Sequence, residues 1–149
     1  MNHSILVLNG PNLNMLGSRE PSIYGKESLA DMEANLLALS REHGLGVTFF
    51  QSNHEGAIID RIQESRDNIS GIIANLGGFT HTSIAIRDAF LTSGLPVLEV
   101  HVSNVARRED FRQVNYLSDI AIGSISGFGI LGYQLAFMAF LKLLPTPPP

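Results

Sequence analysis

The stretch SGIIANLGGFTHTSIAIRDAFLTSGLPVLEVHV, residues 70–102, decides the fold. It contains two short apolar runs rich in β-branched residues, 70–75 and 96–102, on either side of a segment with helical character, 82–93. A glycine and a proline follow that segment within three residues, as is typical of a helix end. Two such runs joined through a helix form a βαβ unit, in which the strands pair in parallel.

The same alternation extends over the rest of the chain. Further expected strands are at residues 4–8, 46–51 and 120–124, and further expected helices lie between 28 and 44, between 52 and 67, and from about 127 to 144. This order predicts an α/β fold of the flavodoxin-like, doubly wound type, a sheet of five parallel strands with helices on both faces. We expect a single domain over residues 1–144 and a mobile proline-rich tail at 145–149.

The composition limits the kinds of function. The chain has 149 residues, a formal net charge of −4 and no cysteine. Bulk charge therefore gives no support for a nucleic-acid partner, and cysteine–zinc sites and thiolate nucleophiles are excluded. The histidines lack the spacing of a helical metal site, so we expect no metal. Only Lys26 and Lys142 are available for a mechanism that forms an imine.

Nothing in the sequence suggests a membrane anchor. The N-terminus lacks the basic region of a signal peptide. The most apolar segment, 128–144, is shorter than a typical membrane span and carries Gln134 and Lys142. We therefore expect a cytoplasmic protein.

Polar residues follow each expected strand, at the edge where doubly wound sheets bind ligands. The first strand is followed by the loop NGPNLNMLGSREPSIYG, residues 9–25, which is longer than most connections and too rich in Gly and Pro to predict a helix. Amides, hydroxyls, imidazoles and glycines follow the other strands at residues 51–54, 75–83, 101–104 and 126–129. This composition predicts a site for a small polar ligand.

Glu99 and His101 are the first candidate catalytic pair. They lie two residues apart in an expected buried strand, so their side chains point to the same face. A carboxylate beside an imidazole selects its tautomer and stabilises its protonated form. His101 is therefore a candidate general acid that Glu99 orients, and a purely structural pair is the alternative.

Arg19 and Tyr24 in the loop 9–25 are the second candidate pair. A free tyrosine has a pKa of about 10 and is a poor base at neutral pH, but a nearby guanidinium favours the phenolate. Residue types alone support equally well a tyrosine that anchors the loop beside a solvated arginine. Further arginines, Arg107, Arg108 and Arg112, follow the fourth strand, where an arginine could bind an anionic substrate group.

Five fragments together resemble the type II 3-dehydroquinate dehydratases. They are LNGPNLNMLGSREPSIYG (8–25), QSNHEGAIID (51–60), NLGGFTHTSIAIRDA (75–89), EVHVSN (99–104) and GFGILGY (127–133). The resemblance runs in register over about residues 4–143. It implies a flavodoxin-like fold, removal of water from 3-dehydroquinate to give 3-dehydroshikimate without metal or organic cofactor, and a dodecamer built from trimers.

The resemblance also implies residue roles. Tyr24 would be the base, kept ionised by Arg19 on a mobile lid, and His101, oriented by Glu99, would protonate the departing hydroxyl. Asn12 would help hold a water that stabilises the enolate. The positions that match substrate-binding residues are Asn75, His81, Val102, Ser103 and Arg112, and Asp88 matches a residue that reaches a neighbouring subunit's site. The departures from the family pattern, none at an expected catalytic position, are Leu76, Gly78, Phe79, Ala106, Val114 and Asn115.

Other classes fit less well. A flavin-binding electron carrier needs a phosphate loop after the first strand, and NGPNLN is not one. A signalling receiver domain needs an acceptor aspartate where this chain has Asn75. A non-catalytic relative would lack Tyr24 or His101, and both are present. The sequence does not distinguish a biosynthetic role from breakdown of quinate, since both use the same reaction.

Overall fold

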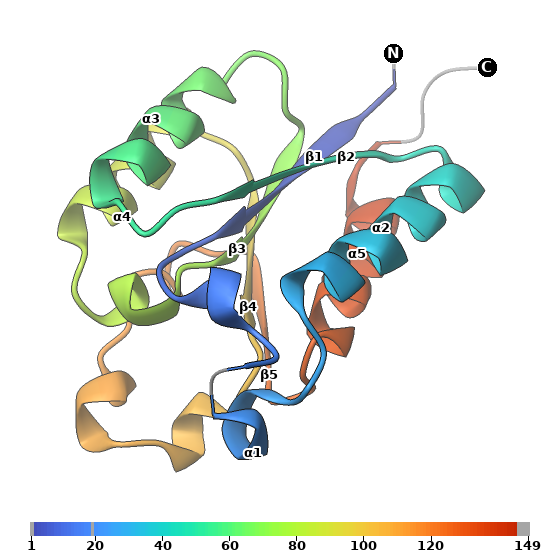
Figure 1. Ribbon diagram of the computed structural model, residues 1–149. Helices are drawn as coiled ribbons and strands as arrows, with labels where there is room; N and C mark the ends of the chain where they lie inside the picture. The colour runs from blue at the N-terminus through green and yellow to red at the C-terminus, as the bar shows by residue number, and fades with distance from the viewer. Residues whose placement is uncertain (1, 19, 146–149) are drawn as a thin grey trace.

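The computed structural model describes residues 2–18 and 20–145 of the chain. Its centre is a sheet of five parallel strands in the order β2-β1-β3-β4-β5 (Figure 1). The strands are β1 (Ser4–Asn9), β2 (Gly46–Gln51), β3 (Gly71–Asn75), β4 (Val97–His101) and β5 (Gly123–Ser126). This order is that of a flavodoxin-like sheet, so the predicted fold class is confirmed.

Helices cover both faces of the sheet. They are α1 (Pro21–Tyr24), α2 (Leu29–His43), α3 (Glu55–Glu64), α4 (Ile84–Ser93) and α5 (Leu131–Leu143). In Figure 1, α2 and α5 lie on one side of the sheet and α3 and α4 on the other. Alternate residues of β1 serve the two faces, since Ile5 and Val7 pack with α2 and α5, and Leu6 and Leu8 with α3 and α4. Burial on both faces explains why the strand is an unbroken apolar run.

Two of the predicted helix boundaries are set by local chemistry that the sequence reveals. The Ser28 hydroxyl accepts a hydrogen bond from the Asp31 amide, and the Asp31 carboxylate accepts one from the Ser28 amide, which forms a capping box at the start of α2. Gly44 ends the same helix with φ at 73°, a conformation that glycine adopts without strain.

Other boundaries differ from the prediction. The fifth strand begins at Gly123, because the amides of Ile120 and Ala121 turn back to the Leu117 carbonyl instead of extending into the sheet. The last helix begins at Leu131, four residues later than expected. The helix expected at 82–93 is α4, and it begins at Ile84, after a short 3₁₀ helix at Gly77–His81.

The described residues of the loop 9–25 contain more helical structure than its composition predicted. It contains a 3₁₀ turn at Leu13–Met15 and the single helical turn α1, which starts with Pro21 at a position where proline is well tolerated. The expectation that this segment is not helical is therefore wrong for its last residues. Residues 146–149 of the predicted tail lie outside the described residues.

The loops that follow β1 and β3 approach each other closely. The Gly10 amide donates to the Asn75 carbonyl at 2.8 Å, and a Cβ added at Gly10 would lie 2.2 Å from the Leu76 carbonyl oxygen. Only glycine permits this approach. The contact brings the residues after both strands to one edge of the sheet. Within the described part of the chain, no helix is long and apolar enough to cross a membrane.

Candidate active site

A cavity of about 140 Å³ opens at the carboxyl ends of β1, β3 and β4. Predicted site residues that line it are Asn12, Tyr24, Asn75, His81, His101, Val102, Ser103 and Arg112. Arg108, Pro11, Leu13, Gly77, Gly78 and Val105 complete the lining. The parallel sheet thus gathers side chains from Pro11 to Arg112, 101 positions apart in the sequence, as expected for this edge.

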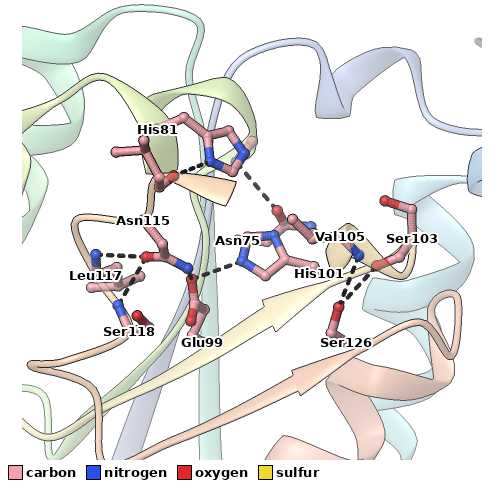
Figure 2. A network of polar contacts seen from close by, with 12 residues as sticks. Asn75, His81, Glu99, His101, Ser103, Val105, Asn115, Leu117, Ser118 and Ser126 are labelled. Carbon is pink, nitrogen blue, oxygen red and sulfur yellow. Dashed lines mark hydrogen bonds and ion pairs between the residues drawn. The ribbon is translucent and has the colours of Figure 1, made fainter. Parts of the chain in front are cut away.

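His101 and Glu99 form a buried pair at the end of β4. The His101 Nε2–H donates to Glu99 Oε2 at 2.7 Å (Figure 2). Glu99 is 1% exposed and His101 is 7% exposed. Because Nε2 is taken by the carboxylate, Nδ1 is the imidazole nitrogen left to exchange a proton with a ligand in the cavity.

Glu99 accepts a second hydrogen bond from outside the strand. The Asn115 Nδ2–H donates to the same oxygen, Oε2, at 2.7 Å. Burial acts to raise the pKa of Glu99, but the hydrogen bond and positive charge of His101, the Asn115 amide and, more weakly, the Ser124 hydroxyl together hold it below its ordinary value. Glu99 is therefore an anion that is hydrogen-bonded to the His101 imidazole.

Tyr24, at the end of α1, also lines the cavity and contacts Arg108. The Arg108 Nη1–H donates to the Tyr24 hydroxyl oxygen at 3.1 Å and to Ser103 Oγ at 3.0 Å. The guanidinium carbon also lies 5.2 Å from the centre of the Tyr24 ring. Tyr24 is thus a phenol of the cavity whose oxygen accepts a hydrogen bond from a positively charged side chain.

His81 presents a neutral imidazole to the cavity. Its Nδ1–H donates to the Val114 carbonyl at 2.6 Å, which leaves Nε2 as an acceptor. Partial burial is the main cause that lowers the pKa of His81 below its ordinary value, and the neighbouring His101 and Arg112 act in the same direction. His81 can therefore accept a hydrogen bond from a ligand hydroxyl.

Asn75 is oriented by a buried chain of hydrogen bonds. Its Nδ2–H donates to the Tyr133 hydroxyl at 2.9 Å, and that hydroxyl donates to Asn9 Oδ1 at 2.5 Å. The Gly77 amide donates to Asn75 Oδ1 at 3.3 Å. These three contacts determine which way the Asn75 amide faces. Burial raises the pKa of Tyr133, so its hydroxyl stays protonated and donates.

Amide side chains at the end of β2 and just after it support the loop that carries Asn12. Asn12 has φ at 69°, and its backbone amide donates to Asn53 Oδ1 at 3.0 Å. The Gln51 side-chain amide donates to Asn53 Oδ1 and to the Gly10 carbonyl, at 3.2 and 3.1 Å. Asn12 is thereby held at the cavity wall in a left-handed conformation that asparagine tolerates better than most residues.

Two guanidinium groups line the cavity, and one carboxylate contacts both. Arg112 Nε donates to Glu109 Oε2 at 2.5 Å, and Arg108 Nη2 lies 3.7 Å from Glu109 Oε1. Glu109 is about half exposed, so part of the positive charge of Arg108 and Arg112 remains available to the cavity. The cavity can therefore bind a ligand that carries a carboxylate together with several hydroxyls.

Comparison with known proteins agrees with this geometry. The family described as dehydroquinase class II matches residues 3–141. The chain belongs to this family. A 3-dehydroquinate dehydratase of Prochlorococcus marinus is 53% identical over 95% of this chain and 96% of its own length. A catabolic 3-dehydroquinase of Aspergillus fumigatus is 58% identical over 91% of both chains.

A solved structure supports the same assignment. The type II dehydroquinase of Butyrivibrio crossotus superimposes with a TM-score of 0.90 at 43% identity, covering 95% of this chain and 98% of that one. The family and the relatives identify an enzyme, a hydro-lyase.

Among the described residues, two predicted site residues are absent from the cavity lining: Glu99, which is hydrogen-bonded to His101, and Asp88. Arg19 lies outside the described residues. Asp88 is exposed on α4, away from the cavity lining. Within residues 2–18 and 20–145 there is no group of three or more His, Asp and Glu side chains that could hold a metal ion.

Three contacts of the site were missed by sequence reasoning. Arg108 was considered only for binding an anion, and it contacts Tyr24. Asn115 was placed among positions without a catalytic role, and it donates to Glu99. Tyr133 occurs in a fragment that resembles the family, but no charge or spacing linked it to Asn75. No local pattern could have shown these pairs, which are 84, 16 and 58 residues apart.

Proposed function

We propose that the enzyme removes water from 3-dehydroquinate to give 3-dehydroshikimate through an enolate, with Tyr24 as the base and His101 as the acid. The observation that carries this proposal is that two groups suited to acid–base chemistry line the same cavity. One is a phenol in contact with a guanidinium, and the other is an imidazole in contact with a buried carboxylate. An elimination beside a ketone needs one group of each kind.

In the first step, the Tyr24 phenolate removes a proton from the carbon beside the ketone. Arg108 stabilises that phenolate before the proton arrives, and Arg19 has the same role in the mechanism that the family resemblance implies. Negative charge then accumulates on the ketone oxygen of the substrate. A water molecule held by Asn12 would stabilise this enolate through a hydrogen bond.

In the second step, the enolate collapses and the hydroxyl on the neighbouring carbon leaves. Protonated His101 gives its Nδ1 proton to that hydroxyl, which departs as water, and the imidazole becomes neutral. Glu99 supports this role because its charge stabilises the imidazolium while its hydrogen bond to Nε2 holds the ring in place. Tyr24 then releases its proton to solvent and neutral His101 takes one up from solvent, which regenerates both groups with no net change in protons.

Substrate recognition falls to the remaining lining residues. Arg112 suits the substrate carboxylate, and backbone amides near Val102 and Ser103 can add donors to the same group. Asn75 and the neutral His81 suit hydroxyl groups, since the orientation of each is determined by a contact outside the cavity. We further propose that the enzyme works as a dodecamer built from trimers, in which Asp88 reaches the site of an adjacent subunit.

The test is to add purified enzyme to 3-dehydroquinate and to follow the enone absorbance of the product. We expect turnover that is unaffected by borohydride, because neither Lys26 nor Lys142 lines the cavity. Covalent labelling of either lysine with loss of activity would contradict the mechanism. A relative named 3-dehydroquinate dehydratase and one named catabolic 3-dehydroquinase are 53% and 58% identical to this chain, so sequence identity does not distinguish the two pathways. Growth of a deletion strain on quinate would assign the pathway.

A further inference from the structure

We propose that Asn115 is a positioning residue for the general acid, whose side-chain amide holds the Glu99 carboxylate in the orientation in which it pairs with His101. The inference rests on the proposed function, because it assumes that His101 acts as the acid. It goes further in assigning a catalytic consequence to a residue outside β4, on the segment that follows the 3₁₀ helix at Asp110–Gln113.

The orientation of the Asn115 amide is determined by the backbone. Its Oδ1 accepts hydrogen bonds from the amides of Leu117 and Ser118, at 2.8 and 2.9 Å. An oxygen that accepts two N–H groups cannot be exchanged with the side-chain nitrogen, which has no acceptor capacity. The Nδ2–H group must therefore point the other way, toward Glu99, as Figure 2 shows.

The two direct hydrogen bonds of the Glu99 carboxylate are on one oxygen, and the Ser124 hydroxyl adds only a weaker interaction. Both His101 Nε2 and Asn115 Nδ2 donate to Oε2, at 2.7 Å each. The other oxygen, Oε1, is buried and has no donor in hydrogen-bonding geometry within the described part of the chain. The terminal torsion of a glutamate is broad. A second donor on Oε2 narrows the range of this torsion in Glu99. It thereby keeps Oε2, rather than Oε1, in contact with His101.

Burial makes this second donor important. Glu99 is 1% exposed, so bulk water is not available to replace a donor that is removed. A buried carboxylate that loses a hydrogen bond is less favourable as an anion. Without Asn115, Glu99 would orient the imidazole less well and stabilise its protonated form less strongly, and both effects slow the step in which His101 gives up its proton.

A structural role is the alternative that an experiment must exclude. Asn115 caps the turn at residues 115–118, and the same segment supplies the Val114 carbonyl to His81. A substitution could therefore act by loosening the turn. The matched control is Ser93→Ala, because Ser93 Oγ likewise accepts from an amide two residues later, that of Leu95, at 3.1 Å, and lies outside the cavity lining.

The primary test compares kcat and KM of Asn115→Ala and Ser93→Ala with those of the parent enzyme on 3-dehydroquinate. We expect Asn115→Ala to lower kcat at least about tenfold, as for a lost hydrogen bond to a charged group, and to change KM less than about threefold. Ser93→Ala should leave both constants unchanged. Parent kcat in a folded Asn115→Ala variant would overturn the inference.

A double-mutant cycle separates positioning from structure. In a His101→Ala background, Asn115→Ala should lower the residual turnover by less than about twofold, because the group through which it acts is gone. An undiminished tenfold loss there would show that Asn115 acts on the fold and would refute the inference. A parent enzyme that does not dehydrate 3-dehydroquinate would instead refute the proposed function.

A second substitution covers the case in which the alanine variant does not fold. Asn115→Asp keeps an oxygen for the amides of Leu117 and Ser118 but places a second carboxylate against Glu99. It should lower kcat at neutral pH at least about tenfold because like charges in contact are unfavourable. Asn68→Asp, an exposed substitution of the same charge, should leave kcat unchanged. Equal kcat for both variants would again overturn the inference.

Discussion

Removing the charge of Arg108 should weaken the proposed base, Tyr24, without removing it. Arg108→Met keeps a long apolar side chain to pack against the Tyr24 ring but deletes the guanidinium that donates to the Tyr24 hydroxyl at 3.1 Å. We expect kcat at neutral pH to fall roughly 30- to 150-fold. KM should change less, because Arg112 remains to bind the substrate carboxylate.

The magnitude follows from the contact distance. Two opposite charges about 4 Å apart interact with about 4 kcal/mol at the effective dielectric constant of about 20 that applies near protein surfaces. The Arg108 side chain is 12% exposed, so water entering the space left by the substitution recovers part of this energy. A net loss of about 2 to 3 kcal/mol corresponds to the stated range, at about 1.4 kcal/mol for each factor of ten.

The assay is the enone absorbance of the product, recorded as kcat and KM over a range of pH. The loss in Arg108→Met should shrink as pH rises, since hydroxide then ionises the tyrosine that the guanidinium no longer assists. Arg107→Met is the matched control, because Arg107 is the exposed neighbour with the same charge. A loss that is the same at every pH, or an equal loss in Arg107→Met, would refute the reasoning.

Three further predictions concern stability. Gly10→Ala should lower the free energy of unfolding by at least about 2 kcal/mol, because its Cβ would meet a backbone oxygen at 2.2 Å. Gly56→Ala in α3 is the control, since its Cβ would meet open space and should not lower the free energy of unfolding. Thermal unfolding of the two variants measures the difference. The folded-state pKa of Glu99 lies below the ordinary 4.5, so its ionised form stabilises the fold above pH 4.5, and this contribution is lost as pH falls. Urea unfolding of Glu99→Gln should therefore show a weaker decline in stability under acid than the parent does. Tyr133→Phe leaves two buried amides without their shared partner and should cost about 1 to 3 kcal/mol in the same measurement.

Much of the fold could be predicted because each element carries its own signal. Strand β1 is an almost unbroken apolar run, and α2 has both a capping serine and a terminal glycine. The fifth strand was placed about three residues too early. Residues 120–122 are as apolar as a strand, but their position is decided by amides that bond to Leu117 and by pairing with β4, which no local pattern contains.

The composition of the site could be predicted more fully than its contacts. Parallel strands place their carboxyl ends at one edge, so polar residues after each strand were expected to meet, and most of them line one cavity. The spacing of Glu99 and His101 on a strand also gave their contact directly. Contacts between distant segments, such as Tyr24 with Arg108, depend on how loops pack and were not accessible from residue spacing.

The central claim is that Tyr24 is the base, and Tyr24→Phe tests it most directly. The substitution removes only the hydroxyl that accepts from Arg108, so the packing of the ring against the core should persist. With enone absorbance as the readout, kcat should fall at least about a hundredfold, while KM changes much less. Near-normal turnover in a folded Tyr24→Phe enzyme would show that the tyrosine only anchors the loop and that the base lies elsewhere.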